Sequence, residues 1–349
     1  MFGVDTCGFN GNTDEELCNR WMQLSAFFPF YRNHNTLGAI SQEAYTWASV
    51  TEAAKTAMAI RFQLLPYIYT LFYYAHTQGT TIMRALAWNF PNDPTLAAAD
   101  RQFFLGDSVL VTPVLEQGAT SVDGVFPGIM DGSEAYYDWY TKSPVPKPAT
   151  ANTSIPAPLG HIPVYVRGGA VLALQQPAMT TRDARMTPWS LLVALGVDGK
   201  ATGRYVFAFK LPFPFRRTPC YIPNPSKSPQ MLTPPPRSLY LDDGVSRVPT
   251  STKLVTFTAN TTSIAASVSG WYRDSNALSN ITVMGLPSAP PSGTAAAATL
   301  NGQRIGRGTY NATAKTFFIG HLDRVTSGGA WEASWELAFS GGGGGNSSS

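Results

Sequence analysis

Hydrophobic and polar residues follow one pattern before residue 84 and another after it. A short apolar run at Phe2–Val4 precedes a segment in which Thr13 and Glu16 form the S/T-x-x-E box that caps helices. A second apolar run, Ala26–Tyr31, predicts a short strand. The helix expected between the two runs has apolar residues at helical spacing, namely Leu17, Trp21, Leu24 and Phe28.

A second capping box, Ser49 with Glu52, predicts a long helix from Ala53 to about Leu65. Pro66 is expected to kink or restart this helix, which then continues to Gly79. Strand, helix, strand and helix make two βα units, and two such units cannot close a barrel or cover a parallel sheet. Residues 1–83 are therefore expected to be the last part of a larger barrel.

From residue 84 the chain consists of short β-rich runs separated by Gly, Pro and Asp. Many short strands at this spacing predict one or two antiparallel sandwiches. We expect a proximal sandwich at 84–178, a distal one at 179–340 and a disordered tail at 341–349. The clearest runs are 108–112, 162–166, 170–174, 191–195, 254–258 and 334–339.

Residues 205–237 interrupt this pattern. The segment holds nine of the chain's 27 prolines, together with Cys220, and shows no sustained alternation. Proline removes backbone donors from a sheet, so the segment cannot extend a strand. We expect it to be an unspliced intron read in frame, with the sequence before it joined to Ser238–Gly244 in the native protein.

Composition excludes several classes of protein. Charged residues make up 13% of the chain, against about 25% in an average protein, and the net charge of +3 is not gathered into a basic patch. We therefore expect no nucleic-acid partner. No stretch approaches the roughly 20 apolar residues of a membrane span. The residues after Met1 also lack the pattern of a signal peptide.

Cysteines and glycosylation triplets point instead to an oxidising lumen. The spacing of Cys7 and Cys18 is compatible with and favours a short-loop disulfide; the alternative is that both are buried thiols. About two Asn-x-Ser/Thr triplets would be expected by chance, so the five found here favour a glycosylated protein. They lie at Asn152, Asn260, Asn280, Asn311 and Asn346.

The segment DTCGFNGNTDEELCNRWMQLSAFFPFYRNHN, residues 5–35, strongly resembles glycoside hydrolase family 31 α-glucosidases. The similarity continues through residues 53–76, 101–106, 112–115 and 164–169 and ends recognisably at 239–244. It implies a fold of the last two βα units of a (β/α)8 barrel, followed by the two sandwiches. The implied reaction is hydrolysis of terminal α-linked glucose with retention, with no metal or cofactor.

Carried over residue by residue, the resemblance implies that His34 hydrogen-bonds the sugar in the −1 subsite. Phe9 would form an apolar wall of that pocket, and Asp5 a carboxylate at or just behind it. Arg32 would support them, and a Cys7–Cys18 disulfide would hold the loop. The variant pattern implies an α-glucoside or maltooligosaccharide substrate and a secreted, vacuolar or lysosomal enzyme.

The two catalytic carboxylates of a retaining glycosidase lie about 5 Å apart. In the family they belong to W-x-D-M-N-E and G-D-N motifs, and neither motif occurs in this sequence. Asp242-Asp243-Gly244 is more typical of a turn than of a catalytic pair. Glu43 is interpreted as loop surface and Glu52 as a helix cap, so we expect the chain alone to be inactive.

Two hypotheses remain at this level. The first is a C-terminal fragment of a family 31 α-glucosidase. The second is a non-catalytic carbohydrate-binding or structural β-sandwich protein that kept the C-terminal domains. Sequence encoding the missing strands upstream of Met1 would favour the first.

Overall fold

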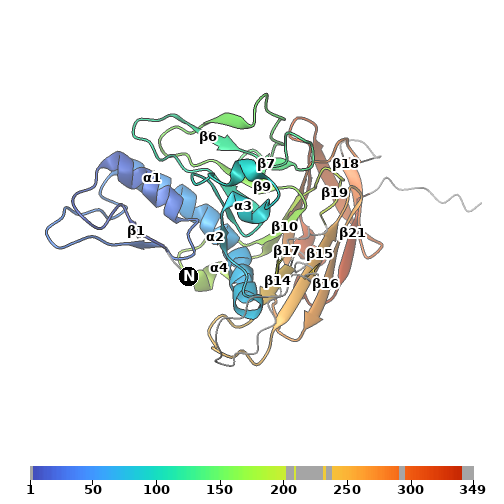
Figure 1. Ribbon diagram of the computed structural model, residues 1–349. Coiled ribbons are helices and arrows are strands. Elements are labelled where there is room, and N and C mark those ends of the chain that lie inside the picture. The colour runs from blue at the N-terminus through green and yellow to red at the C-terminus, as the bar shows by residue number, and fades with distance from the viewer. Residues whose placement is uncertain (1–2, 202–207, 210–230, 233–237, 291–294, 340–349) are drawn as a thin grey trace, which may run out of the picture.

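The computed structural model describes residues 3–201, 208–209, 231–232, 238–290 and 295–339. The helical N-terminal part lies on the left in Figure 1 and the large C-terminal sheet on the right. The expected tail at 341–349 lies outside the described residues. Of the expected intron at 205–237, only two backbone stretches are described, which pair as β12 (Ala208–Phe209) and β13 (Met231–Leu232).

The N-terminal part alternates strands and helices. Its elements are β1 (Asp5–Thr6), α1 (Glu15–Ser25), β2 (Arg32–Asn33) and α2 (Ala48–Gln78). The two strands pair in parallel, with Asp5 opposite Arg32. The second strand begins after the apolar run Ala26–Tyr31, which is not a strand as predicted. Arg61 of α2 holds that run in place, because its Nη1 donates to the carbonyls of Ala26 and Phe28 at 2.7 Å each.

Helix α1 is capped one residue later than its sequence predicts, and it buries a different face. Asp14, not Thr13, is the N-cap, and its carboxylate accepts from the backbone N–H of Leu17 at 2.9 Å. The buried side chains are mostly small or polar: Cys18, Asn19, Met22, Gln23 and Ser25. The predicted apolar stripe instead lines a pocket of about 410 Å³, together with Val4 and Leu115.

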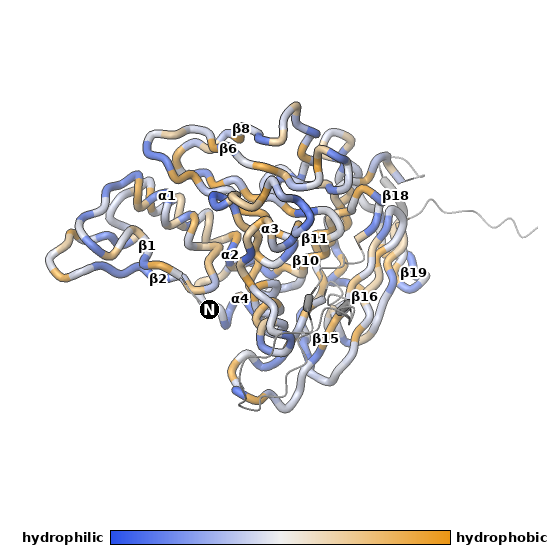
Figure 2. Tube along the Cα trace, in the orientation of Figure 1, coloured by the Kyte–Doolittle hydropathy of each residue, from blue (hydrophilic) through white to orange (hydrophobic). Residues whose placement is uncertain are grey.

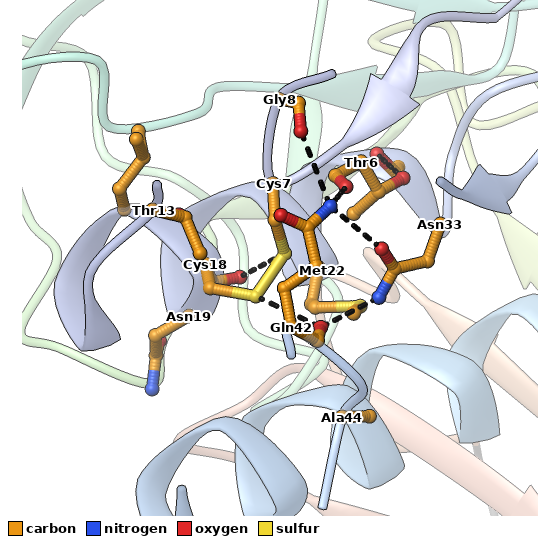
Figure 3. Close-up of a disulfide and its surroundings, with 12 residues drawn as sticks. Thr6, Cys7, Gly8, Thr13, Cys18, Asn19, Met22, Asn33, Gln42 and Ala44 are labelled. Carbon is orange, nitrogen blue, oxygen red and sulfur yellow. Dashed lines mark hydrogen bonds between the residues drawn. A yellow bond between two sulfur atoms is a disulfide. The ribbon is translucent and has the colours of Figure 1, made fainter. Parts of the chain in front are cut away.

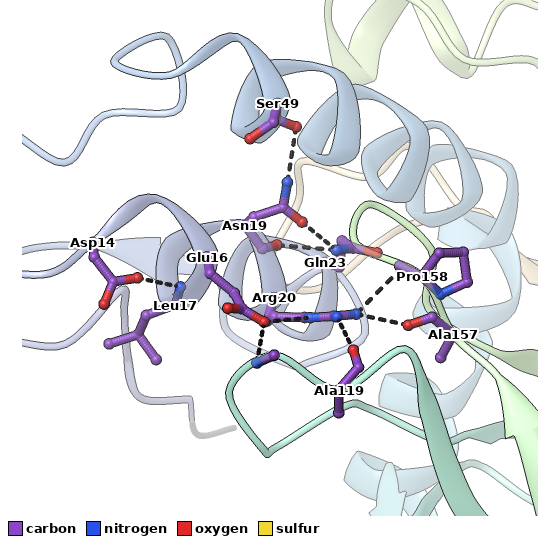
Figure 4. Close-up of polar contacts among 11 residues, drawn as sticks. Asp14, Glu16, Leu17, Asn19, Arg20, Gln23, Ser49, Ala119, Ala157 and Pro158 are labelled. Atoms are coloured by element: carbon purple, nitrogen blue, oxygen red, sulfur yellow. Dashed lines mark hydrogen bonds and ion pairs between the residues drawn. The ribbon is translucent and has the colours of Figure 1, made fainter.

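Polar contacts tie α1 to the β-rich region that follows (Figure 4). Arg20 donates from Nη1 to the carbonyl of Ala157 at 3.0 Å and from Nη2 to that of Ala119 at 2.5 Å. Glu16 accepts from the backbone N–H of Gly118 at 2.8 Å. Buried backbone carbonyls need hydrogen-bond donors, and Arg20 supplies them to loops that lie about a hundred residues further along the chain.

Helix α2 is a single helix of 31 residues that contains Pro66. The expected restart at Pro66 does not occur, and Thr70 hydrogen-bonds the Pro66 carbonyl at 2.8 Å. The helix begins at Ala48 with Trp47 as N-cap, so Ser49 is not a cap; its hydroxyl donates to Glu15 at 2.6 Å. Gly79 ends the helix in the left-handed conformation, which glycine adopts without steric cost. Hydrophobic residues are spread along much of α2 (Figure 2) and many of them are buried, so the helix packs against neighbours on several sides.

The next region, from β3 to β9, holds a five-stranded antiparallel sheet in the order β3-β4-β5-β9-β7. Two short helices lie between its first strands, α3 (Leu86–Asn89) and η1 (Pro94–Leu96). A two-stranded pair, β6 (Ser121–Val125) with β8 (Asn152–Pro156), lies beside it. The sheet strands are β3 (Met83–Arg84), β4 (Phe103–Leu105), β5 (Val109–Val111), β7 (Tyr136–Asp138) and β9 (Val164–Arg167).

The C-terminal region is one ten-stranded sheet in the order β10-β11-β17-β20-β19-β18-β21-β16-β15-β14. Its pairings are antiparallel except for β11 with β17. The first strands and connections are β10 (Ala170–Leu174), α4 (Thr181–Ala184), β11 (Trp189–Ala194), β14 (Ser238–Leu241), β15 (Lys253–Ala259) and β16 (Ser263–Gly270). The rest are β17 (Leu278–Met284), β18 (Ala295–Leu300), β19 (Gln303–Asn311), β20 (Thr316–Ile319), η2 (Leu322–Arg324) and β21 (Trp335–Ala338).

One large core fills the inside of this sheet. Trp331 lies at its centre and packs edge-on against Trp189 and Phe257, with ring centroids 5.7 and 5.5 Å away. Strands from both ends of the sheet contribute to the same core, so the sheet closes over it. The other face of β10 and β11 packs towards α2 through Leu172, Leu174 and Leu192. The sheet is therefore attached to the N-terminal helices through its first two strands.

Candidate active site

Two of the polar residues singled out in the sequence, Asp5 and Arg32, are opposite each other as the first residues of the two-residue strands β1 and β2. Arg32 donates to Oδ1 of Asp5 from Nε at 2.7 Å and from Nη2 at 2.6 Å. The Asp5 side chain is 18% exposed and that of Arg32 is 53% exposed. Both hydrogen bonds end on Oδ1, so the second carboxylate oxygen is not used by Arg32. The ion pair holds Asp5 in one orientation and keeps a negative oxygen available.

Phe9 and His34 meet just beyond the C-terminal ends of the same strands. Their ring centroids are 5.2 Å apart and the rings are tilted by 48°. The backbone N–H of Thr36 donates to the carbonyl of Phe9 at 2.9 Å, which ties the two loops together. Phe9 is 41% exposed, so part of its ring faces the solvent beside His34. The structure thus brings Asp5 to Arg32 and Phe9 to His34.

A disulfide fixes the loop after β1, and Gln42 fixes it from the other side (Figure 3). Cys7 and Cys18 are bonded, with their Cα atoms 4.5 Å apart, which confirms the expected pairing. Gln42 Nε2 lies within hydrogen-bond distance of the carbonyls of Thr6 and Gly8, at 3.1 and 3.2 Å, and of Asn33 Oδ1 at 2.9 Å. One side chain therefore joins both strand ends.

Sequence inspection missed Gln42, because nothing in its neighbourhood marks it. The residue lies in a loop, and its role depends on partners 9 to 36 positions away. The Asn33 amide also donates to the Gln42 carbonyl at 2.7 Å. A pocket of about 620 Å³ opens beside this network and is lined by Asn33, His34, Asn35, Gln42, Glu43 and Tyr45, among others.

The other carboxylates considered as catalytic groups have structural partners. Both oxygens of Asp242 lie 2.9 Å from the hydroxyl of Tyr69. Asp243 accepts from the backbone N–H groups of Val245 and Ser246 and from the Ser246 hydroxyl, and these bonds lower its pKa to about 2. This geometry is that of a turn, as the sequence indicated. Glu52 pairs with Lys55 at 2.9 Å instead of capping the helix.

The glycosylation triplets that the structure describes differ in exposure. Asn152 and Asn311 are exposed, whereas Asn260 and Asn280 are partly buried. Asn346 is outside the described residues. Among the described residues, no three His, Cys, Asp or Glu side chains gather where they could hold a metal ion. No described helix combines the length and apolar character needed to cross a bilayer.

Two family models match the chain in succession. Residues 1–71 match the TIM-barrel domain of glycosyl hydrolases family 31, and residues 79–172 match the family 31 C-terminal domain. An α-glucosidase of Aspergillus niger is 52% identical over 341 residues, which are 97% of this chain and 31% of that protein. Glucoamylase 1 of Schwanniomyces occidentalis is 44% identical over 339 residues, with the same coverage. The chain thus spans about a third of the length of these relatives.

Solved structures give the same picture of the fold. The glucosidase II α subunit, in its α3-Glc2-bound form, superposes with a TM-score of 0.74 at 25% identity, over 97% of this chain and 34% of that one. A Flavobacterium johnsoniae family 31 dextranase superposes with a TM-score of 0.70 at 20% identity, over 96% of this chain and 39% of that one.

Proposed function

The chain belongs to glycoside hydrolase family 31, and from this premise we propose that it is the C-terminal part of a retaining α-glucosidase. In this proposal residues 1–83 supply the last two βα units of the catalytic barrel. Residues 84–178 and 179–340 are the proximal and distal β-sandwich regions, with β10 passing from the first into the sheet of the second. The observation that carries the proposal is the parallel pair β1–β2, with the Asp5–Arg32 ion pair within it and the Phe9–His34 contact just past its C-terminal end. Catalytic residues of β/α barrels lie at that end of the strands.

The four side chains match what a glucosyl unit needs. A pyranose ring presents C–H groups that pack on an apolar face, and hydroxyls that require directional partners. Phe9 offers the apolar face, while His34 and the Asp5 oxygen that Arg32 leaves open offer polar groups. Arg32 positions Asp5. The disulfide and Gln42 keep the two loops rigid, so that the groups are already oriented when the sugar arrives.

The nucleophile and the acid/base are proposed to come from a part of the enzyme that this chain does not include. Retention needs two carboxylates about 5 Å apart on either side of the glycosidic bond. Asp5 is engaged by Arg32, and Asp242 and Asp243 serve a turn. We therefore expect the 349-residue chain to bind one side of the sugar but not to hydrolyse it.

The substrate is proposed to be a terminal α-linked glucose, as in maltose or a maltooligosaccharide. The Aspergillus niger relative is named an α-glucosidase, which supports this assignment. The disulfide and the surface positions of Asn152 and Asn311 support an oxidising, glycosylating compartment. A secreted, vacuolar or lysosomal enzyme fits both.

A chimera tests the proposal directly. The chain would replace the matching segment of the Aspergillus niger α-glucosidase, with the unaltered enzyme as the control. We expect the chimera to release glucose from maltose, and the 349-residue chain alone to release none above background. A folded chimera without activity would contradict the proposal, as would purified chain that hydrolyses maltose and loses that activity on Asp5→Asn.

A further inference from the structure

A second pocket, away from the candidate active site, surrounds the exposed Trp88. It measures about 440 Å³ and lies between the segment 88–94 and the loop 128–133. It shares no lining residue with the pocket beside His34. Trp88 is 58% exposed, although Leu86, two residues earlier in the same short helix, is fully buried. An exposed indole beside a pocket is a common feature of binding sites, because it offers a large rigid apolar surface.

The base of this pocket is held in place by buried contacts. The Phe90 ring lies 4.4 Å below the guanidinium of Arg167, which is itself buried and paired with Glu134. Asn89, at the end of the Trp88 helix, donates to the carbonyl of Gly106 and accepts from Arg84, both at 3.3 Å. Gly128 closes the facing loop with a φ of +77°, and a side chain there would collide with Glu134. The pocket is therefore preformed.

Hydrogen bonds hold the polar groups on its rim in fixed orientations. Asp93 Oδ1 accepts from the backbone N–H and the hydroxyl of Thr95, at 3.0 and 2.6 Å. Asp131 Oδ1 accepts from the backbone N–H of Ser133 at 2.9 Å. These bonds hold both carboxylates in one orientation at the rim. Asn92 is exposed beside them and adds an amide.

The residues that line the Trp88 pocket favour a neutral ligand with several hydroxyl groups. No Lys or Arg lines the pocket, and two carboxylates would repel a phosphate or a nucleic acid. A metal is disfavoured, since the described residues contain no group of three or more carboxylate, imidazole or thiol side chains. A flat aromatic surface beside amide and carboxylate groups matches a pyranose, whose C–H face packs on the ring and whose hydroxyls donate to the rim.

We propose that the Trp88 pocket is a second saccharide site, which binds glucosyl units of an α-glucan chain at a distance from the catalytic site. The choice of α-glucan rests on the proposed function. A second site of this kind holds a polymer on the enzyme and raises the local concentration of its chain ends at the active site.

The 349-residue chain itself provides the test. Indole-15N labelling would give signals from its eight tryptophans, and maltoheptaose would be added at increasing concentration. We expect the Trp88 indole signal to shift, whereas that of Trp271, which follows β16 and is 90% exposed, should not move. By calorimetry, Trp88→Ala should weaken binding about tenfold or more, and Asp131→Asn about fivefold. Trp271→Ala, the matched control, should leave binding unchanged.

Each outcome decides a different point. The proposed Trp88 site is wrong if maltoheptaose does not shift the Trp88 signal, or if it binds Trp88→Ala as tightly as the unaltered chain. If the chimera is active, either result leaves the proposed function intact. Equal Trp88-dependent binding of cellohexaose overturns the assignment to α-glucan. Trp88-dependent binding by a chain whose chimera is inactive supports the site and counts against the proposed function alone.

Discussion

Arg167 and Glu134 form a two-point ion pair in the interior of the chain, with Nε to Oε2 at 3.0 Å and Nη2 to Oε1 at 2.6 Å. Their side chains are 7% and 5% exposed. Burial alone lowers the pKa of Arg167, but its hydrogen bonds and charge contact with Glu134 outweigh this effect and raise the pKa. The pair links the strand β9 to the loop before β7, beneath the Trp88 pocket.

Breaking this pair from one side should be costly. Glu134→Gln leaves the buried guanidinium without a counter-charge, which typically costs about 3 kcal/mol of unfolding free energy or more. Denaturant unfolding of the two proteins measures the difference. Glu116→Gln is the matched control, because its partner Arg101 is exposed and the pair lies at the surface, so unfolding should hardly change. Equal effects at the two positions would refute this account.

Removal of the disulfide should destabilise the loop that carries Phe9. The bond closes a loop between positions 11 residues apart, which predicts a loss of about 2–3 kcal/mol in the double variant Cys7→Ser, Cys18→Ser. Thermal unfolding with and without reductant measures this loss, and the double variant should no longer respond to reductant. Peptide mapping should find Cys220, which lies outside the described residues, as a free thiol. A bond from Cys220 to either of the others would contradict the assignment.

His34→Ala tests the proposed sugar contact in the active chimera. In the variant a buried sugar hydroxyl would lose its hydrogen-bond partner, which should raise the activation free energy by about 1–3 kcal/mol. The value of kcat/KM should therefore fall roughly 5- to 150-fold. His76→Ala, at the exposed end of α2, is the control and should leave kcat/KM unchanged. An unchanged value for His34→Ala would remove His34 from the sugar-binding site.

Lys142 should make stability depend on alkaline pH. Burial lowers the pKa of its ammonium from 10.5 to about 8, against an opposing effect of Asp138. The unfolded chain therefore binds more protons between these values, so the Lys142 contribution to stability rises with pH, at most by about 1.4 kcal/mol per unit. Below pH 8 that contribution is constant.

The measurement is the difference in unfolding free energy between the unaltered chain and Lys142→Met. Taking the difference cancels the buried tyrosines, whose raised pKa values act in the opposite direction above pH 10. We expect the unfolding free energy of the unaltered chain to rise relative to that of the variant between pH 8 and pH 10. A difference that stays flat across this range would show that Lys142 is not dehydrated as described.

The strand β15 shows where the two flanks of the proposed intron belong. Ala201 pairs with Ala259, and Ser238 pairs with Thr256, on the same edge of β15. Two residues separate the partners on β15, so two residues should separate Ala201 from Ser238. Removal of 204–237 leaves Thr202 and Gly203 there and keeps Ala201 and Leu239 on the buried face. The boundary expected from sequence, 205–237, leaves one residue too many.

Two deletion variants distinguish these boundaries. The variant without 204–237 should fold with one continuous strand from Ala201 to Leu241. The variant without 205–237 should be less stable by about 1.5–3 kcal/mol, because the extra residue turns Leu239 outwards or forces a bulge. Unfolding of both measures the difference, and sequencing of mature transcripts shows which codons are kept. Transcripts that retain the whole segment would disprove the splice hypothesis.

Patterns in the sequence predict elements well where a motif fixes both identity and spacing. The segment from Asp5 to His34 is the clearest case: the helix between the two apolar runs and the Cys7–Cys18 pairing could both be anticipated, although the two strands follow the apolar runs instead of coinciding with them. Gly79 and Asp242–Gly244 likewise behave as their local chemistry suggests. In each case the determining interactions lie close together in the sequence or in a familiar pattern.

The face of α1 shows where such patterns fail. Periodicity counts apolar side chains, but α1 buries Asn19 and Ser25 because partners elsewhere satisfy them. Asn19 donates to the Ser49 carbonyl at 3.0 Å, and Ser25 accepts from Thr6 at 2.8 Å. Gln42 was missed for the same reason, since its partners come from two other segments. Long-range polar pairing leaves no local mark.

Helix α2 contacts both the N-terminal region and the C-terminal sheet. One side packs on α1, while Tyr69, Thr70 and Tyr74 hydrogen-bond Asp242, Tyr240 and Ser238 of the C-terminal sheet. Loss of β14 would therefore remove hydrogen-bond partners from α2, the same helix that supports the loops of Phe9 and His34. A destabilising change in the ten-stranded sheet would then loosen the geometry of the proposed sugar-binding site, without any substitution near it.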